Sequence, residues 1–154
     1  MFRIGVTGIV LFGALVLASG SLGLTSSAAT GPAQIGISGE QTNFVRIDIG
    51  RKGRSPGDTE ITRQALYNRR VSNKAIGHSS LICTFTIGPE RVCRGTFFLP
   101  KGKLVVGGSI TFRQVYELAV TGGTGLYDNG RGTLTSTRIK KAPRREFLLF
   151  RLVG

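Results

Sequence analysis

Apolar and polar residues alternate in short runs through the second half of the chain, and turn residues separate these runs. Gly88-Pro89, Pro100 to Gly102 and the glycines after Thr121 are such turn signals. Successive short strands without a helical pattern between them indicate an antiparallel barrel or a sandwich. The predicted strands cover residues 80–87, 92–99, 103–112, 114–121, 131–138 and 145–153.

Two earlier segments complete this all-β pattern. Asn43 to Ile49 alternates clearly, whereas residues 59–75, around Tyr67, fit either a helical turn or an irregular strand. We favour an extended conformation there, because the other segments are extended. The total of about eight strands is enough to close an antiparallel β-barrel around side chains or one small ligand. We therefore predict a single β-barrel domain over residues 44–154.

Residues 1–29 have the composition of a signal peptide. An apolar run without acidic residues is followed by Ser27 and Ala29, which fit the small-x-small pattern of a signal-peptidase site. We predict export and cleavage after Ala29, giving a secreted, extracellular protein. The alternative is an uncleaved anchor, since about 20 apolar residues span a bilayer. Residues 30–43 are predicted to be a flexible leader into the domain.

The chain is strongly basic, with a formal net charge of +13. Its Lys and Arg residues gather in short clusters at 51–54, 69–70, 140–141 and 144–145, where turn residues or breaks in alternation indicate loops. No basic helical face and no stacking-aromatic motif accompanies them, so specific nucleic-acid binding is not expected. A weak attraction to anionic surfaces or polymers stays open.

Two cysteines, Cys83 and Cys93, flank the turn signal at Gly88-Pro89. A hairpin folded about Gly88 places them opposite each other, and an exported protein meets an oxidising compartment, so we predict a disulfide. No metal site is expected, because His78 is the only histidine and the thiols are paired. Hydrolase activity is not expected either, since no nucleophile-elbow motif is present.

The segment from Glu117 to Leu134 is the most informative part of the sequence. Apolar alternation runs into Gly122, Gly123 and Gly125 and resumes after them, so we interpret the segment as strand, tight turn and strand. It lacks the lysine and the following helix of a phosphate-binding loop.

Two further strand patterns concern the faces of the sheet. Phe44, Arg46 and Asp48 share one side of the early strand, so Asp48 is a carboxylate opposite the aliphatic row. Residues 116–120 and 147–153 are apolar on both sides. An outer apolar row needs cover, and a partner subunit is the natural candidate.

The motif Glu117-x-Ala-Val-x-Gly-Gly-Thr-Gly-x-Tyr127, followed by Arg131-Gly132, resembles the signature of plant dirigent proteins. The stretch from Lys103 through the glycines to the last apolar strand is similar to the corresponding part of allene oxide cyclases, which share that barrel. The resemblance covers residues 44–153 and implies an eight-stranded antiparallel β-barrel, usually a homotrimer, whose lumen binds a small hydrophobic molecule. The signal segment points to an exported, bacterial member.

The two families suggest related activities. Dirigent proteins steer the coupling of phenoxy radicals, and allene oxide cyclases guide the ring closure of a fatty-acid epoxide. Neither uses a metal or an organic cofactor, and the mechanism in both is mainly orientation in a dry cavity.

The resemblance also suggests site residues. Asp48 falls where dirigent proteins carry an acid on the first strand, and it precedes Ser55-Pro56 as the allene oxide cyclase glutamate precedes a Ser-Pro pair. Asp48 is then a lumen acid that orients or protonates a ligand; the alternative is a solvated residue paired with a neighbouring arginine. Ser55, Pro56, Tyr127 and Arg131 are candidate ligand contacts, and Arg131 fits a structural ion pair equally well.

We therefore expect an exported dirigent-like or allene oxide cyclase-like barrel that binds a small hydrophobic molecule. The sequence leaves open whether it also directs cyclisation or stereoselective coupling, and so whether it is an enzyme; an enzymatic form would be a cofactor-free isomerase or cyclase. The alternative function is a non-catalytic secreted barrel that binds an anionic surface or polymer through its basic loops.

Overall fold

The computed structural model describes residues 33–69, 74–111 and 114–153, and the predicted signal peptide with its cleavage site lies outside them. Among these residues there is no helix long and apolar enough to cross a membrane. The elements are strands β1 (Ala33–Ile47), β2 (Thr59–Asn68), β3 (Gly77–Phe85), β4 (Glu90–Leu99), β5 (Gly102–Thr111), β6 (Val115–Gly125), β7 (Arg131–Lys141) and β8 (Arg144–Val153).

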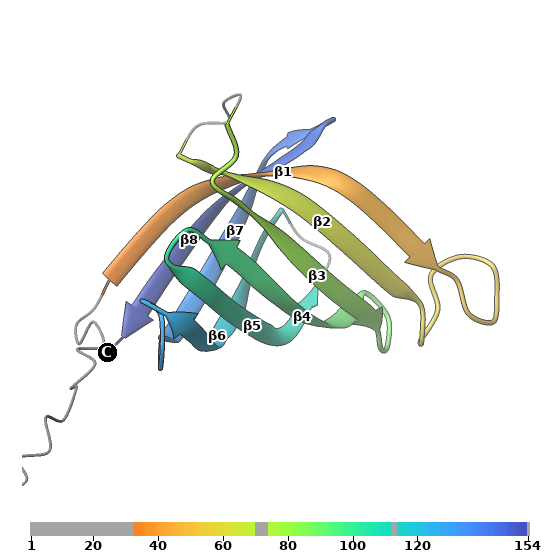
Figure 1. Ribbon diagram of the computed structural model, residues 1–154. Coiled ribbons are helices and arrows are strands. Elements are labelled where there is room, and N and C mark those ends of the chain that lie inside the picture. The colour runs from red at the N-terminus through yellow and green to blue at the C-terminus, as the bar shows by residue number, and fades with distance from the viewer. Residues whose placement is uncertain (1–32, 70–73, 112–113, 154) are drawn as a thin grey trace, which may run out of the picture.

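These strands form a closed barrel in sequence order (Figure 1). Each strand pairs antiparallel with the next, and β8 returns to pair with β1. The predicted eight-stranded antiparallel β-barrel is confirmed, including the segment after Thr59 that also fitted a helical turn.

Strand β1 begins earlier than the sequence pattern predicts. Residues 33–43, expected to be a flexible leader, form most of it and pair with both β2 and β8. Ile37 lies in the core, and a Cβ at residue 39 would lie only 2.7 Å from the Gln64 side-chain oxygen. The small residues that suggested a leader are thus needed for a strand that crosses close to other side chains.

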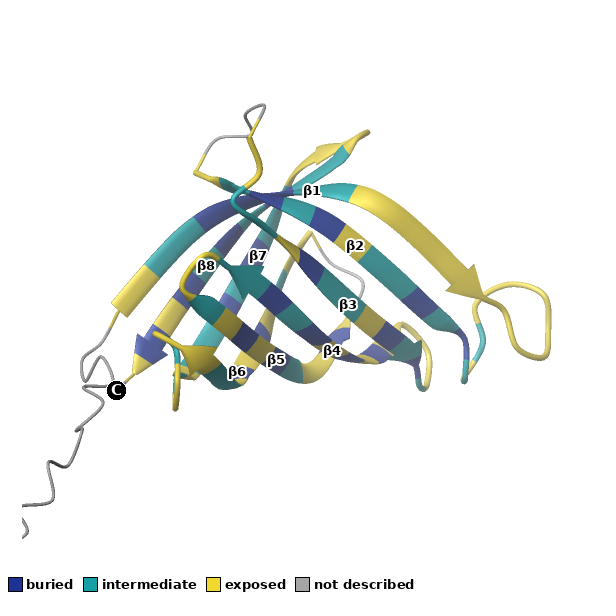
Figure 2. Cartoon of the chain, viewed as in Figure 1, coloured by how far each residue is buried: buried dark blue, intermediate teal, exposed yellow. Residues whose placement is uncertain are grey.

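Strand β1 is not paired equally along its length. Its pairing with β8 covers only Ala33 to Glu40, whereas its pairing with β2 continues to Ile47. The last part of β1, residues 41–47, therefore has a neighbouring strand on one edge only, and Figure 2 shows that it is largely exposed. The barrel is closed at the end where β1 begins and open at one edge where β1 ends.

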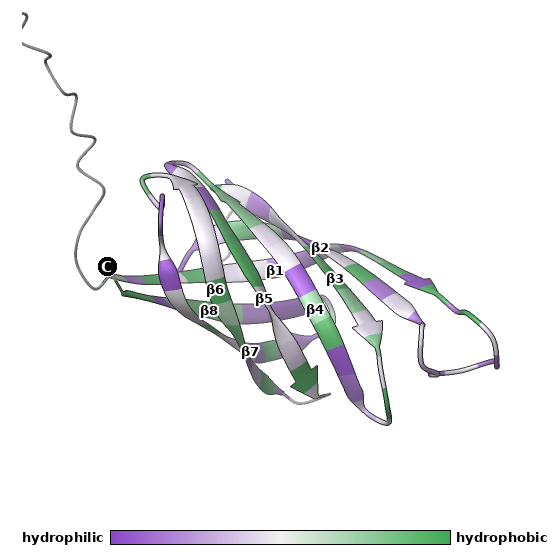
Figure 3. Cartoon of the chain, turned by 90° about the horizontal axis from the view of Figure 1, so that it is seen from below, coloured by the Kyte–Doolittle hydropathy of each residue, from purple (hydrophilic) through white to green (hydrophobic). Residues whose placement is uncertain are grey.

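Inward-facing side chains fill the barrel, and alternating hydrophobic and hydrophilic positions are visible along the strands in Figure 3. Packing around Phe150, whose ring meets that of Phe97 edge-on at 5.0 Å, is dense and apolar. The buried cluster includes Ile37, Leu66, Leu104, Val106, Leu118, Val120, Leu134, Leu148 and Leu152.

The predicted disulfide is confirmed. Cys83 on β3 lies directly opposite Cys93 on β4 in the strand register, and their sulfur atoms are bonded. The hairpin turns at Gly88, whose φ of 62° lies in the left-handed region. Both cysteines are buried, so the bridge ties two neighbouring strands from the inside of the barrel.

The glycine cluster has a structural role, but the turn lies after it. Strand β6 continues through Gly125, and the turn occupies residues 126–130. A Cβ on Gly123 would come within 2.1 Å of the Tyr127 carbonyl oxygen, so this position needs glycine because the chain approaches itself closely.

Candidate functional site

Polar side chains enter the barrel chiefly from β2. Glu60 and Gln64 are buried and point inward with Thr62, while Ile61 and Arg63 occupy the alternate positions. The strand is therefore polar on its inner face over most of its length. This reversal of the usual pattern explains why its sequence looked ambiguous.

The first ionic group of the lumen is a carboxylate between two guanidinium groups. Arg46 Nη2 donates to Glu60 Oε1 at 2.6 Å, and Arg91 Nη1 donates to Glu60 Oε2 at 2.5 Å. The hydrogen bond to Glu60 raises the pKa of Arg46. Burial lowers the pKa of Arg91, and the charge of Glu60 opposes that effect. Both guanidinium groups stay charged in the working pH range.

The second ionic group is centred on Glu146 of β8. Arg144 donates to Glu146 Oε1 through Nε at 2.7 Å and through Nη2, while Gln64 Nε2 and the Tyr116 hydroxyl donate to Oε2 at 2.8 and 3.4 Å. Ser79 Oγ then donates to the Gln64 side-chain oxygen at 3.2 Å. The network links four strands and meets the hydrogen-bonding needs of a buried charge.

Tyr116 supplies a neutral donor to this network. Burial and, secondarily, the negative charge of Glu146 raise the pKa of Tyr116 to about 12. The phenol is therefore protonated at neutral pH and donates its one hydrogen bond to Glu146 Oε2.

These groups surround a cavity of about 20 Å³ within the barrel. That is room for about one water molecule. A bound molecule at this place would meet two carboxylates as acceptors and a phenol and guanidinium groups as donors. The wall of the cavity consists of Glu60, Thr62, Gln64, Ser79, Leu81, Cys83, Arg91, Phe97, Ile110, Tyr116, Arg144 and Glu146. No group of three His, Cys, Asp or Glu side chains that could hold a metal ion occurs among the described residues.

Asp48 does not take the lumen position expected from the sequence. Strand β1 ends at Ile47, and Asp48 is an exposed residue of the following loop, where it accepts a hydrogen bond from the Gly53 backbone N–H at 3.2 Å. The alternation in the sequence continues past Ile47, where the strand ends. The lumen acid on this side of the barrel is instead Glu60, opposite Arg46.

Ser55 and Pro56 lie in the same loop as Asp48 and do not line the cavity. Ser55 donates its backbone N–H to Asp58 Oδ2 at 2.8 Å, and the Ile49 N–H donates to Oδ1 at the same distance. These two backbone hydrogen bonds lower the pKa of Asp58. The Ser-Pro pair thus shapes a loop that is organised around a buried carboxylate.

Tyr127 and Arg131 lie at the opposite end of the barrel. Tyr127 is half-buried in the turn after β6 and packs against the apolar core, where burial raises the pKa of its hydroxyl. Arg131 is exposed at the start of β7 and donates to the Thr121 backbone oxygen at 3.2 Å. The structure therefore brings Asp48 and Ser55 together in one loop and separates them from the other two candidates.

The sequence contains a signal for part of this group of charged residues inside the barrel. The disulfide fixes Cys93 on the inner face of β4, and Arg91 has the same parity two residues earlier. A charged residue on that face needs a partner inside the barrel, which points to an inward-facing acid.

A closed barrel with an apolar lumen and one internal charged cavity belongs to the class of small barrels that enclose side chains or a single small ligand. Comparison with family models and with curated proteins gave no match.

Several solved structures are similar to this chain. A pyocyanin demethylase is 25% identical over 75% of this chain and 98% of that chain, with a TM-score of 0.66. The Diels-Alderase AbmU from Streptomyces koyangensis is 12% identical over 83% of this chain and 72% of that chain, with a TM-score of 0.62. A pterocarpan synthase dirigent protein is 14% identical over 79% and 82% of the two chains, with a TM-score of 0.59. The chain therefore has the barrel fold of these proteins, which include the dirigent proteins that the sequence resemblance predicted.

Proposed function

We propose that this protein binds a small hydrophobic molecule at the charged end of its lumen and directs the cyclisation or coupling of that molecule. The observation that carries the proposal is the internal cavity at which Glu60, Glu146 and Tyr116 converge within an otherwise apolar barrel. The structural neighbours support it, since a Diels-Alderase and a dirigent protein use barrels of this kind.

The chemistry of the site suits orientation more than bond cleavage by a nucleophile. The enclosed cavity limits the access of water and holds a flexible ligand in one folded shape. When a ligand oxygen gains negative charge during ring closure, the phenol of Tyr116 donates its single hydrogen bond to that oxygen in place of Glu146. Before the ligand binds, the Glu146 carboxylate accepts the hydrogen bond of that phenol and keeps it oriented. No cofactor takes part in the proposed step.

A ligand needs more space than the present cavity. The volume of about 20 Å³ accommodates one water, so entry requires side chains at the cavity to move. Arg46 and Arg144 are the most exposed members of the ionic groups and have the freedom to do so.

A cavity-filling variant tests the proposal. Ile110 is buried in the cavity wall, and Ile110→Trp should abolish binding of N-phenyl-1-naphthylamine, a neutral aromatic probe that fluoresces in apolar sites. Ile82→Trp adds the same ring at an exposed position and should leave binding unchanged. Equal binding by both variants, or no binding by the unaltered protein, would contradict the proposal.

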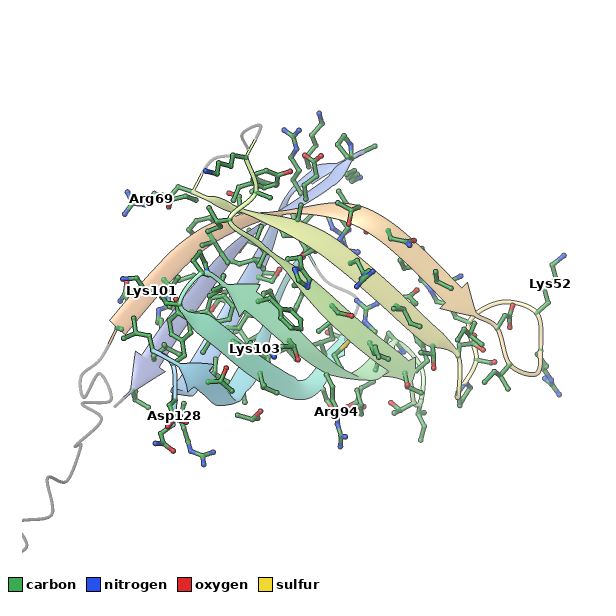
Figure 4. The ribbon with its side chains drawn as sticks, viewed as in Figure 1. Lys52, Arg69, Arg94, Lys101, Lys103 and Asp128 are labelled. Carbon is green, nitrogen blue, oxygen red and sulfur yellow. A yellow bond between two sulfur atoms is a disulfide. The ribbon has the colours of Figure 1, made fainter. Side chains whose placement is uncertain are left out.

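A second candidate function is attachment to an anionic surface or polymer through the basic loops. Lys52 and Arg51 are exposed in the loop between β1 and β2, which extends well beyond the barrel, and Figure 4 shows Lys52 pointing into solvent at its tip. Retention on immobilised heparin should fall steeply with salt and should weaken in the Arg51→Gln/Lys52→Gln variant. Retention that changes neither with salt concentration nor in this variant would rule out this candidate.

We also infer that the protein is secreted and self-associates, with the trimer as the form suggested by its family. The buried disulfide fits an oxidising compartment. Ile82, Val92 and Val105 are exposed on the outer face of neighbouring strands β3, β4 and β5 and offer an apolar contact. Light scattering should show an oligomer that Val105→Arg converts to a monomer; a monomeric unaltered protein would contradict the inference.

A further inference from the structure

Two arginines stand at the rim of the charged cavity, on strands β1 and β8. The Arg46 and Arg144 side chains are 34% and 22% exposed, whereas their partners Glu60 and Glu146 are 7% and 2% exposed. Of these ionic groups, the two rim arginines are the ones that solvent, and hence an arriving ligand, reaches first.

Neither rim arginine is the sole partner of its carboxylate. Glu60 keeps the buried guanidinium of Arg91 on its second oxygen, and Glu146 keeps Gln64 and Tyr116. Arg46 can therefore turn toward a ligand while Glu60 keeps a cationic partner, and when Arg144 turns, Glu146 keeps two neutral hydrogen-bond donors that lower the cost of its buried charge.

Neighbouring carboxylates already have other partners. Asp58 accepts from the Ile49 and Ser55 backbone N–H groups, and Glu40 accepts from Arg145. Three guanidinium groups, those of Arg46, Arg91 and Arg144, thus share the two lumen carboxylates. An arriving anion is the group that complements this arrangement.

An apolar contact lies beside the arginines. Phe44 pairs in register with Thr62, a residue of the cavity wall, so the ring is on the inner face of β1. It is nevertheless 43% exposed, since β1 has no β8 partner at this point. A ligand entering past Arg46 would meet this aromatic surface.

We propose that the ligand is an organic anion: an apolar body that carries a carboxylate-like group, held at the rim by Arg46 and Arg144 with its body against Phe44 and within the lumen. This inference rests on the proposed function and names the ligand class of the same site. Arg46 and Arg144 determine specificity, and their shift toward the ligand exposes one oxygen each of Glu60 and Glu146 to the bound molecule.

A matched pair of probes tests the ligand class. 1-Anilinonaphthalene-8-sulfonate and N-phenyl-1-naphthylamine share one aromatic frame, and only the former carries an anionic group. We expect the anionic probe to bind roughly tenfold or more tightly than the neutral one, and the ratio of the two affinities to fall to about one in the Arg46→Gln/Arg144→Gln variant. The single variant Arg144→Lys, in which Arg46 is kept, should retain part of the preference for the anionic probe.

Arg94→Gln is the control for overall charge. Arg94 is exposed on the outer face of β4 and points away from the barrel in Figure 4, so this variant should keep the full preference for the anion. Binding of the neutral probe without any preference for the anion overturns the inference and leaves the proposed function standing. A preference that survives the double variant, or that Arg94→Gln abolishes equally, also overturns it. Failure of both probes to bind overturns the proposed function itself.

Discussion

The two halves of the lumen differ in what holds them together. At the end where β1 begins, Phe150 and Leu134 belong to a buried apolar cluster whose stability comes from area removed from water. At the end where β1 finishes, Glu60 and Glu146 are held by directional ionic hydrogen bonds around a small cavity. The apolar half tolerates few changes of side-chain volume, whereas the ionic groups of the charged half can exchange hydrogen-bond partners.

This difference assigns the halves different roles. A fully packed apolar half fixes the barrel and supplies most of its stability, because each buried large side chain contributes about 1.5–3 kcal/mol. The charged half contributes little net stability, since desolvation offsets much of the attraction within buried ion pairs. In the function proposed above, it supplies instead a set of donors and acceptors for a ligand.

The largest effect is expected in the apolar half. Phe150→Ala should lower the free energy of unfolding by about 3–5 kcal/mol, because it removes a fully buried ring that packs against Phe97. Urea unfolding followed by circular dichroism measures the change. Val92→Ala, at an exposed position, should cost well under this amount. Equal losses for the two variants would contradict the division between core and surface.

In the charged half, removing a carboxylate should cost almost as much as removing a core ring. Glu60→Gln leaves the buried Arg91 guanidinium without its counter-charge, and breaking such a pair costs about 3 kcal/mol. The double variant Glu60→Gln/Arg91→Met should recover part of the loss, because the unpaired charge is then gone. If the double variant were less stable than the single one, the buried pair would be a net stabilising element.

The disulfide lies where the halves meet, since Cys83 lines the cavity and Cys93 belongs to the apolar cluster. The Cys83→Ser/Cys93→Ser variant should lose about 2–3 kcal/mol of stability, because the bridge closes a short loop in the unfolded chain. The two cysteines are separated by 10 residues, so the entropic gain is at the lower end of the usual range. Urea midpoints under identical buffer conditions measure the loss, and an unchanged midpoint would contradict it.

The smallest effect concerns the proton of Tyr116. Its pKa is raised to about 12 in the folded protein from an ordinary value of 10.0, so the folded state holds this proton more tightly than the unfolded state. The resulting stability is present below about pH 10 and is lost as the pH rises toward 12. Tyr116→Phe should flatten the decline in unfolding free energy between about pH 10 and pH 12, whereas an unchanged slope would show that the phenol is not buried as described.

Much of the fold was predictable from alternation, whereas the first half of β1 was not. The strands after Ser79 have clear apolar rows, and the Cys83–Cys93 pairing followed from the turn at Gly88. The beginning of β1 lacks such a row, because Gly39 occupies an inner position where Gln64 needs space to reach Glu146. Such a requirement is set by side chains of the two strands that flank β1 and leaves no pattern within β1 itself.

The site was less predictable for a related reason. Sequence resemblance directed attention to Asp48, one residue beyond the end of β1, whereas the lumen acids are Glu60 and Glu146. Both acids lie on segments where a polar inner face interrupts the alternation expected of a strand. The disulfide shows that Cys93 faces the inside of the barrel. The inner faces of the neighbouring strands are recognised only when this orientation is extended to them through the strand register.

The short pairing between β1 and β8 means that one strand serves two tasks in succession. Up to Glu40 it completes the ring of hydrogen bonds, and beyond that residue it pairs with β2 alone and contributes side chains and a loop to the rim. Under the proposed function, substitutions in residues 41–47 and in the loop that follows them would therefore change which molecules are accepted without reopening the barrel. Ligand preference could then diverge quickly, because variation in that segment is separated from the requirement to fold.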